Sequence, residues 1–313
     1  MINFLSDSLV VGIDIHKKNK PTLPTSGGLC FGVGTVSGIF AYVTIQTFVF
    51  KNRTNLIELL AVVLSILIAL FIGFLDDIGI RREGREIKRF GIKRWQKTLL
   101  TLPAAIPLMA IKAGESQIVL PFIGLVDAGI FFPLILIPLG IVGCTNMVNM
   151  FAGFNGSEAG MGIIYLSSIA IYSYTRAGGV ISFIICLCTI SALLGYIKYN
   201  LFPAKILPGD SSTYVLGAIA GCTIIMANIE RAGIVIMFPF IVEGILKFRS
   251  LVETGNFAGS VGILGKDGKI ESKYKKIYST VHIFQKVGMT EKQITYSMWG
   301  LCFIFAVIPH LIW

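Results

Sequence analysis

The chain has 313 residues, of which 54% are hydrophobic and only 14% are charged, and its mean hydropathy is +0.78. This composition excludes a soluble enzyme, a disordered chain and a collagen-like fibre. The net charge of +10 suits anionic lipid headgroups and phosphorylated substrates, so it does not require nucleic acid as a partner. The six cysteines lie in apolar stretches, which predicts neither a disulfide framework nor a metal cluster.

Nine stretches are apolar enough to be expected to cross a membrane, since a spanning helix needs about 20 mostly apolar residues. In chain order they are 27–50, 56–75, 97–111, a span within 128–157 that ends near residue 148, 159–175, 177–197, 211–229, 232–248 and 293–313. The third is short and contains Pro103 and Pro107, and the eighth contains Glu243. The sequence therefore predicts an all-α polytopic membrane protein with about nine to ten transmembrane helices.

Two apolar stretches are too short to cross. Residues 1–13 are expected to form either a helix on the membrane surface or the remnant of a span that starts upstream of this chain. Residues 116–126 contain proline and glycine and are expected to form a hairpin at the outer surface. We otherwise expect one integral membrane domain over residues 1–313, with residues 250–292 as a cytoplasmic loop insertion.

The basic residues predict the orientation. With nine alternating spans, five of the 27 Lys and Arg residues fall on one side, namely Lys51, Arg53, Lys112, Arg176 and Arg231, and all the others fall on the opposite side. Because positively charged loops remain in the cytoplasm, the second side is expected to face the cytoplasm. This side also carries the polar motifs described next.

Asp76 and Asp77 stand together where the second span meets this surface. Ionised groups at a membrane boundary are costly unless they are solvated, paired or bound to a metal. Two interpretations stay open for this pair. The helix simply ends in water beside Arg81 and Arg82, or the two carboxylates form a hard-oxygen site for Mg²⁺ or for proton abstraction.

A second polar cluster follows the fourth span. Its members are amide, glycine and acidic residues: Asn146, Asn149, Gly153, Asn155, Gly156 and Glu158. Glycine lets the backbone approach a ligand, and the amides can hold a base or a phosphate. The alternative is an interfacial helix cap.

Further candidates lie in three other loops on the same side. Asp210 begins a polar turn before the seventh span, where ordinary helix-start chemistry is the alternative. Lys20 belongs to a lysine-rich turn before the first span and could hold phosphate as a point charge. Arg249 and His282 lie in the long loop from residue 247 to residue 292.

Four motifs in this order resemble the polyprenyl-phosphate N-acetylhexosamine-1-phosphate transferases. They are Pro24-Thr-Ser-Gly-Gly, Phe74-Leu-Asp-Asp, Asn146-x-x-Asn-x-x-Ala-Gly-x-Asn-Gly-x-Glu-Ala-Gly and Gly209-Asp-Ser, and the resemblance runs from about Asp14 to the C-terminus. The form of the segment from Gly153 to Glu158 is similar to the eukaryotic and archaeal dolichyl-phosphate branch. The family usually has ten spans, and this chain shows nine and a short apolar start.

The resemblance implies transfer of GlcNAc-1-phosphate from UDP-GlcNAc to dolichyl phosphate, with release of UMP. The product is then dolichyl-diphospho-GlcNAc, the first lipid-linked intermediate of N-glycosylation. It implies Mg²⁺ as cofactor, with Mn²⁺ as a substitute, and a homodimer is left open. The membrane is the plasma membrane in a prokaryote or the endoplasmic reticulum in a eukaryote, and the active site faces the cytoplasm.

The resemblance also implies roles for individual residues. Asp210 and Asn149 correspond to metal ligands, and Asp76, Asp77 and Lys97 correspond to catalytic groups near the metal and the phosphates. The residues expected to bind substrate are Lys20, Asn146, Gly153, Asn155, Glu158, Arg249 and His282.

Two alternatives stay open. One is a bacterial-type transferase that uses undecaprenyl phosphate for cell-envelope polysaccharide; the last loop lacks the His-rich run of the muramoyl-pentapeptide branch. The other is an ion-coupled transporter in which Asp76, Asp77 and Asp210 form an ion path. None of these acids lies at the middle of a predicted span, which disfavours transport.

Overall fold

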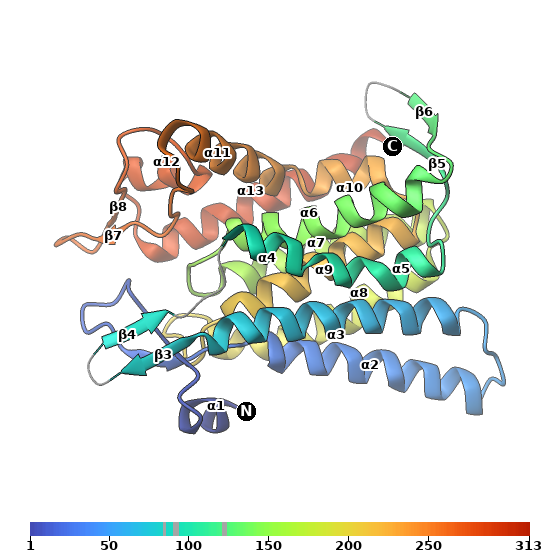
Figure 1. Cartoon of the computed structure of the whole chain (residues 1–313), viewed down its shortest axis with the longest axis horizontal. Helices are drawn as coiled ribbons and strands as arrows, with labels where there is room; N and C mark the ends of the chain where they lie inside the picture. Colours follow the sequence, from blue (N-terminus) through green and yellow to red (C-terminus); the bar gives the residue numbers. More distant parts are fainter. Residues whose placement is uncertain (84–85, 90–93, 121–123) are drawn as a thin grey trace.

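A computed structural model describes residues 1–83, 86–89, 94–120 and 124–313. Its long helices lie side by side in one bundle, with connecting segments gathered at two ends (Figure 1). We call the end where α3 finishes and α9 begins the site end, and the opposite end the far end. The C-terminus lies at the far end.

The long helices follow the predicted apolar stretches closely. They are α2 (Gly28–Phe48), α3 (Leu56–Ile78), η2 with α6 (Phe132–Leu136 and Ile137–Met150), α7 (Ser157–Arg176), α8 (Val180–Asn200), α9 (Gly209–Met226), α11 (Phe238–Thr254) and α13 (Glu291–Ile312). Within the described residues, five helices are long and apolar enough to cross a membrane: α2, α3, η2 with α6, α8 and α13. A helical polytopic membrane protein is thus confirmed, whereas a count of nine to ten spans is not.

Two predicted spans are divided into shorter helices. The stretch with Pro103 and Pro107 forms α4 (Arg94–Leu100), η1 (Leu102–Ala105) and α5 (Ile106–Ala110). The stretch with Pro239 forms α10 (Glu230–Ile236) followed directly by α11. Proline lacks the N–H that the helical hydrogen-bond ladder needs, so each break falls next to a proline.

The connecting segments hold short elements. They are α1 (Ile2–Asp7), the antiparallel pairs β1–β2 (Val11–Ile13 and Thr22–Pro24), β3–β4 (Ile80–Glu83 and Glu86–Arg89), β5–β6 (Gln117–Leu120 and Gly124–Asp127) and β7–β8 (Ile263–Leu264 and Ile270–Glu271), and α12 (Thr280–Val287). The hairpin expected over 116–126 is confirmed and lies at the far end (Figure 1). The apolar start forms α1 and β1.

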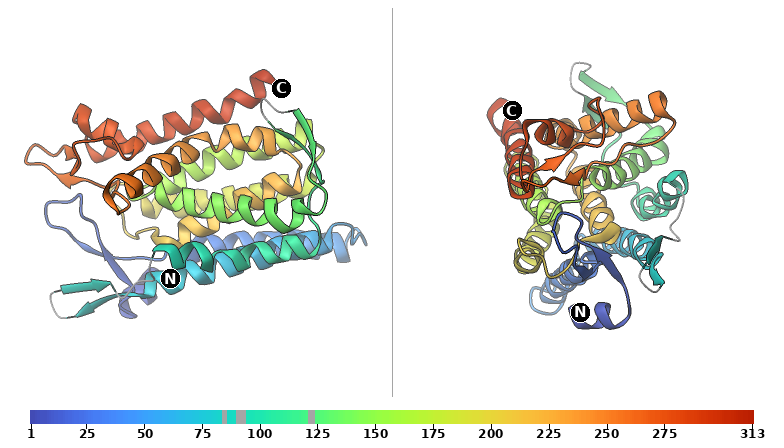
Figure 2. Two further views of the ribbon diagram at one scale, coloured as in Figure 1. Left: turned by 45° about the horizontal axis from the view of Figure 1, so that its top comes forward. Right: turned by 90° about the vertical axis from the view of Figure 1, so that its left-hand side faces the viewer.

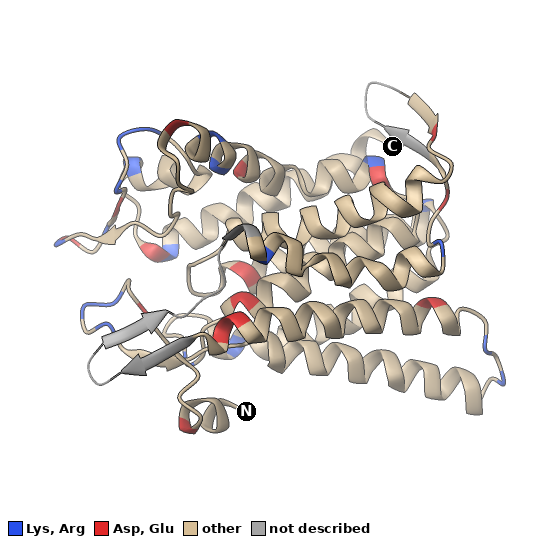
Figure 3. Cartoon of the chain, in the orientation of Figure 1, with Lys and Arg blue, Asp and Glu red and all other residues tan. Residues whose placement is uncertain are grey.

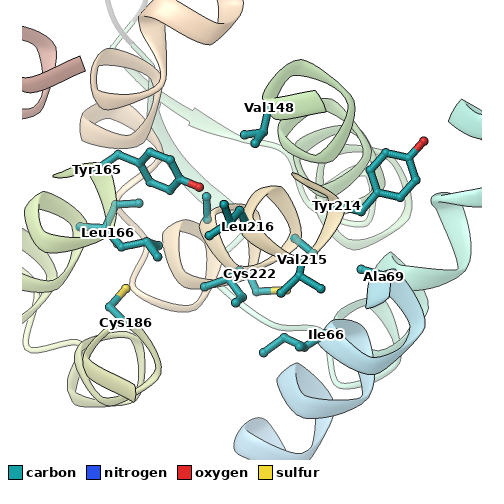
Figure 4. Packing of buried hydrophobic residues seen from close by; sticks show 14 of the residues in the cluster. Ile66, Ala69, Val148, Tyr165, Leu166, Cys186, Tyr214, Val215, Leu216 and Cys222 are labelled. Atoms are coloured by element: carbon teal, nitrogen blue, oxygen red, sulfur yellow. The ribbon is translucent and has the colours of Figure 1, made fainter. Parts of the chain in front are cut away.

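Helix α9 lies at the centre of the bundle, in contact with α2, α3, α6, α7, α8 and α10. The end-on view shows it surrounded by the other helices (Figure 2). Val215, Leu216 and Cys222 of α9 meet side chains of the neighbouring helices in the core (Figure 4). Gly73 of α3 and Gly217 of α9 allow close backbone approach, because a Cβ at either position would overlap the facing helix. Burial of α9 fixes the place of its first turn, which carries Asp210.

Charged residues lie mainly in the connecting segments and at helix ends, and the middle of the bundle is almost free of them (Figure 3). Of the basic residues between Arg81 and Lys97, only the side chain of Lys97 is among those described. The others were counted in predicting the orientation, and their side chains lie outside the described set. The acids of the predicted motifs are at the site end.

Candidate active site

A cavity of about 950 Å³ opens at the site end of the bundle. Its lining combines the ends of α4, α6, α7, α9 and α11 with the end of β1 and two irregular segments, residues 14–16 and 257–261. Seven of the predicted site residues line it, namely Lys97, Asn146, Asn149, Gly153, Asn155, Glu158 and Asp210, and Asp76 lies directly behind Lys97. Such a volume is within the range of small-molecule sites in proteins.

Lys97 contacts two acidic residues, Asp76 and Asp210, that lie far apart in the sequence and are brought together by the fold. Its Nζ lies 2.5 Å from Oδ2 of Asp76 and 2.6 Å from Oδ2 of Asp210. Asp76 is 1% exposed, and a buried carboxylate is stable only when it is paired. Lys97 and Asp210 line the cavity, whereas Asp76 does not. An ammonium group and a carboxylate therefore face the space where a ligand would lie.

Asp77 has a different environment from its neighbour. Its carboxylate accepts hydrogen bonds from the backbone N–H groups of Asp210 (2.7 Å) and Ser211 (3.2 Å) and from the Ser26 hydroxyl (2.9 Å). A carboxylate at the end of α3 is unfavourable for the dipole of that helix, but the N-terminus of α9 offsets it. Asp77 does not line the cavity. It holds the first turn of α9 in place.

The two asparagines of α6 fix neighbouring helices. Asn146 donates to the Thr101 hydroxyl (3.1 Å) and accepts from the Thr98 hydroxyl (3.3 Å), which ties α6 to the segment that carries Lys97. Asn149 accepts from the Thr213 hydroxyl (3.1 Å), one turn after Asp210. Both asparagines also line the cavity, so each amide group makes a hydrogen bond between helices and is at the same time accessible to a ligand.

The glycine-containing loop between α6 and α7 is held from two directions. Glu158 accepts from the backbone N–H of Gly153 (2.8 Å), and Asn155 donates from Nδ2 to Asp14 (2.8 Å). Gly153 has a φ of +119°, which side-chain-bearing residues rarely adopt, and a Cβ there would overlap Val261. The four residues that form these two hydrogen bonds, Asp14, Gly153, Asn155 and Glu158, all line the cavity.

His16 joins this loop to the N-terminal segment. Its ring stacks on Phe154 with the ring centres 4.8 Å apart, and its Nε2 lies 2.6 Å from the carbonyl oxygen of Val261. Since a carbonyl oxygen only accepts, Nε2 carries the proton. Burial lowers the pKa of His16 below its ordinary value, because the charged form is poorly solvated there.

Three predicted substrate-binding residues are not part of the cavity lining. Lys20 is exposed in the segment before β2. Arg249 points to the surface and pairs with Glu253 at 2.7 Å. His282 is buried in α12, where Nδ1 accepts from the Tyr278 N–H (3.2 Å) and Nε2 donates to the Gly259 carbonyl (3.0 Å). Burial lowers the pKa of His282, which favours this neutral form.

Sequence reasoning missed three cavity residues: Asp14, Tyr214 and Lys247. Tyr214 lies four residues after Asp210 in α9, a spacing that places both on one helix face and could have identified it. Lys247 follows Glu243 by four residues inside an apolar stretch, and such a charged pair within a predicted span was a usable signal. Asp14 had no comparable signal, since its partner Asn155 is 141 residues away.

Comparison with known proteins gives an independent assignment. The family model described as glycosyl transferase family 4 matches residues 59–228. A protein of Saccharolobus solfataricus, provisionally named UDP-N-acetylglucosamine–dolichyl-phosphate N-acetylglucosaminephosphotransferase, is 35% identical over 97% of this chain and 88% of its own length. A Dictyostelium discoideum protein with the same enzyme name is 26% identical over 76% of this chain and 64% of its own length.

A bacterial relative is also similar. The phospho-N-acetylmuramoyl-pentapeptide-transferase of Clostridium beijerinckii is 29% identical over 94% of this chain and 83% of its own length. The resemblance inferred from the four motifs is confirmed by these matches. The chain belongs to glycosyl transferase family 4.

Proposed function

We propose that this protein transfers GlcNAc-1-phosphate from UDP-GlcNAc to dolichyl phosphate or a related polyprenyl phosphate and releases UMP. The observation that carries the proposal is the contact of Lys97 with Asp76 and Asp210 beside the cavity. The names of the Saccharolobus and Dictyostelium relatives support the donor and the acceptor. The lipid product would be the first intermediate of oligosaccharide assembly for N-glycosylation.

The cavity offers a suitable surface for each substrate. Lys97, Asn146, Asn149 and Asp210 provide charged and amide groups for a nucleotide diphosphate. Leu99 and Phe248 also line the cavity and are 60% and 61% exposed, so an apolar chain could enter from the surrounding lipid. A site that joins polar groups to a lipid-facing margin suits a reaction between a water-soluble donor and a lipid phosphate.

The donor atoms fit Mg²⁺, with Mn²⁺ as the substitute. Mg²⁺ usually takes one or two carboxylates and completes its shell with substrate phosphate oxygens and water. Asp210 would provide a carboxylate and Asn149 an amide oxygen, and both line the cavity. Among the described residues, no group of three or more His, Cys, Asp and Glu side chains is placed to hold a metal without substrate. This agrees with a metal that arrives with the diphosphate.

The chain has to bring together two anions, the lipid phosphate and the diphosphate of the donor. When bound, Mg²⁺ would neutralise charge on the diphosphate and stabilise UMP as the leaving group. Lys97 provides a positive charge held between two carboxylates at the edge of the cavity. Asp76 holds the ammonium group of Lys97 in place, and Asp77 holds the first turn of α9, which carries Asp210. We propose direct displacement by the lipid phosphate, and a phosphorylated protein formed without lipid would contradict it.

We further propose nine membrane crossings. Helices α4 to α5, α7, α9 and α10 to α11 would cross in addition to the five helices that are long and apolar enough by themselves. The excess of basic residues at the site end then supports a cytoplasmic active site, in the plasma membrane of a prokaryote or the endoplasmic reticulum of a eukaryote. Residues 1–313 would form one domain with 250–292 as a cytoplasmic insertion. A homodimer is compatible with this arrangement.

The test uses purified protein in detergent with dolichyl phosphate, Mg²⁺ and UDP-GlcNAc labelled in the sugar and in uridine. We expect label in the lipid together with free UMP, and loss of both products with EDTA. Release of UDP would indicate transfer of the sugar alone and would contradict the proposal. Parallel reactions compare dolichyl phosphate with undecaprenyl phosphate as acceptor and UDP-GlcNAc with UDP-N-acetylmuramoyl-pentapeptide as donor. Faster turnover with dolichyl phosphate and with UDP-GlcNAc would contradict the bacterial-type alternative.

A further inference from the structure

Four consecutive backbone carbonyls on one side of the cavity are each held by a different side chain. We call residues Phe257–Val261 the cavity wall, because all five line the cavity. The donors and their distances to the carbonyl oxygens are Lys247 Nζ to Ala258 (2.6 Å), His282 Nε2 to Gly259 (3.0 Å), Gln285 Nε2 to Ser260 (2.6 Å) and His16 Nε2 to Val261 (2.6 Å). They come from α11, α12 and the N-terminal segment.

The cavity wall has neither helical nor strand structure. An irregular segment has no hydrogen-bond ladder of its own, and Ala258 and Ser260 are buried, so its carbonyl groups need other partners. Side chains from three parts of the chain provide these partners here. The segment is therefore held in one conformation before any substrate binds, and such preorganisation reduces the entropy lost on binding.

Lys247 makes the most extensive of these contacts. Lys247 is 3% exposed, and besides Ala258 its ammonium group donates to the Ser260 hydroxyl (2.6 Å) and lies 3.3 Å from Glu243. Glu243 is 0% exposed and accepts from the Ser279 hydroxyl (2.6 Å) and the Thr280 N–H (2.8 Å). The ion pair thus connects α11, the cavity wall and the start of α12.

A buried ion pair is an expensive way to stabilise a helix. Desolvation of both charges offsets much of their attraction, and well-packed apolar side chains often stabilise a fold as well or better. An apolar pair would not, however, hold the Ala258 carbonyl and the Ser260 hydroxyl. The charges of Lys247 and Glu243 therefore hold the cavity wall in position, which apolar packing alone would not do.

We propose that Lys247, with Glu243 as its counter-charge, is a positioning residue that fixes the cavity wall against the bound nucleotide sugar. The inference rests on the proposed function. Val261 of the wall lies against Gly153, which is expected to bind the donor, whereas the apolar margin at Leu99 and Phe248 is the side open to lipid. Displacing the wall should therefore weaken binding of the donor more than binding of the lipid acceptor.

The test compares the full-length wild type with the double variant Glu243→Gln/Lys247→Met, which leaves neither charge buried alone. Lys286→Met is the matched control, because Lys286 also donates to a carbonyl (Lys275, 2.7 Å) in the same region but is exposed and does not line the cavity. We expect faster hydrogen exchange of the wall amides in the double variant and a rise of about tenfold in KM for UDP-GlcNAc. The KM for dolichyl phosphate should change less than about twofold, and the control should match the wild type.

Gln285→Met provides a second variant in case the double variant does not fold. Gln285 is uncharged, holds the Ser260 carbonyl and does not line the cavity, so we expect the same direction of change with smaller size. Unchanged exchange of the wall amides, or equal rises in both KM values, would overturn the proposal. If the wild type does not turn over UDP-GlcNAc, the proposed function fails, and hydrogen exchange alone still decides whether Lys247 holds the wall.

Discussion

The carboxylate of Asp77 accepts a hydrogen bond of 2.7 Å from the backbone N–H of Asp210. One acid of the candidate site thereby sets the position of another, although Asp77 itself does not line the cavity. The adjacent Asp76 instead contacts Lys97, which also contacts Asp210. The two neighbouring acids thus reach Asp210 by separate routes, one through the backbone and one through Lys97.

Asp77→Asn should lower both stability and activity. One of the two oxygens that accept the N–H groups of α9 becomes an NH₂ group, so the start of α9 loses a cap worth about 1 kcal/mol. The resulting shift of Asp210 should reduce kcat about 100-fold, as small misplacements of reacting groups do. Thermal unfolding in detergent and UMP release measure the two effects.

Asp76→Asn is the comparison for that variant. It should also reduce kcat, because it removes a partner of Lys97, but it should lower the unfolding temperature less than Asp77→Asn does. Equal loss of stability in the two variants would contradict the separate roles of the two acids.

Lys97→Gln should reduce kcat about 100- to 1,000-fold, because a preorganised positive charge is lost where two phosphates meet. Lys97→Arg should recover part of this loss, since it keeps the charge but changes the geometry. Lys198→Gln is the control, because Lys198 is an exposed lysine at the same end of the bundle. Turnover of the Lys97→Gln variant close to that of the control would show that the ammonium group is not required.

Gly209→Ala should destabilise the start of α9. Gly209 has a φ of +71°, and a Cβ there would overlap the Asp77 carboxylate. The backbone strain alone costs about 1–3 kcal/mol. Gly195→Ala is a matched control, because Gly195 lies inside α8 and an added Cβ meets no other atom within 4 Å. Unfolding temperatures of the two variants should differ, with Gly209→Ala the lower.

Acidification should loosen the N-terminal segment through His16. Because burial lowers the folded-state pKa, the unfolded chain takes up the proton first as the pH falls. The stability that neutral His16 contributes is fully present above the pKa of the unfolded chain, about 6.5. It is lost as the pH falls through the lower pKa that His16 has in the folded protein. His16→Gln keeps a donor for the Val261 carbonyl but does not titrate. Between about pH 7.5 and about pH 5, the wild type should lose more thermal stability than the variant; equal losses would contradict this role.

The helices could be predicted from sequence because a membrane requires long apolar stretches with few charges. The predicted start of α3 at Leu56 agrees with the structure, and the stretch noted for Pro103 and Pro107 is the one divided into α4, η1 and α5. The four motifs predicted the acids and asparagines of the candidate site, since only 14% of the residues in this chain are charged and the motifs stand out among apolar stretches. These inferences used local sequence only.

The detailed arrangement depends on contacts that local sequence does not contain. Arg249 was chosen from the sequence and Lys247 was not, yet only Lys247 lines the cavity. Two residues along a helix turn a side chain by about 200°, so the choice requires knowing which face of α11 meets the cavity. The bond between His16 and Val261 likewise joins residues 245 positions apart.

The most direct test of the account follows the β-phosphorus of UDP-GlcNAc labelled with ³²P. In the presence of dolichyl phosphate and Mg²⁺, we expect the label to move into the lipid fraction in step with release of UMP, and Asp210→Asn to lose this transfer. Label that stays with uridine as UDP, or transfer at the wild-type rate by Asp210→Asn, would contradict sugar-phosphate transfer at this site.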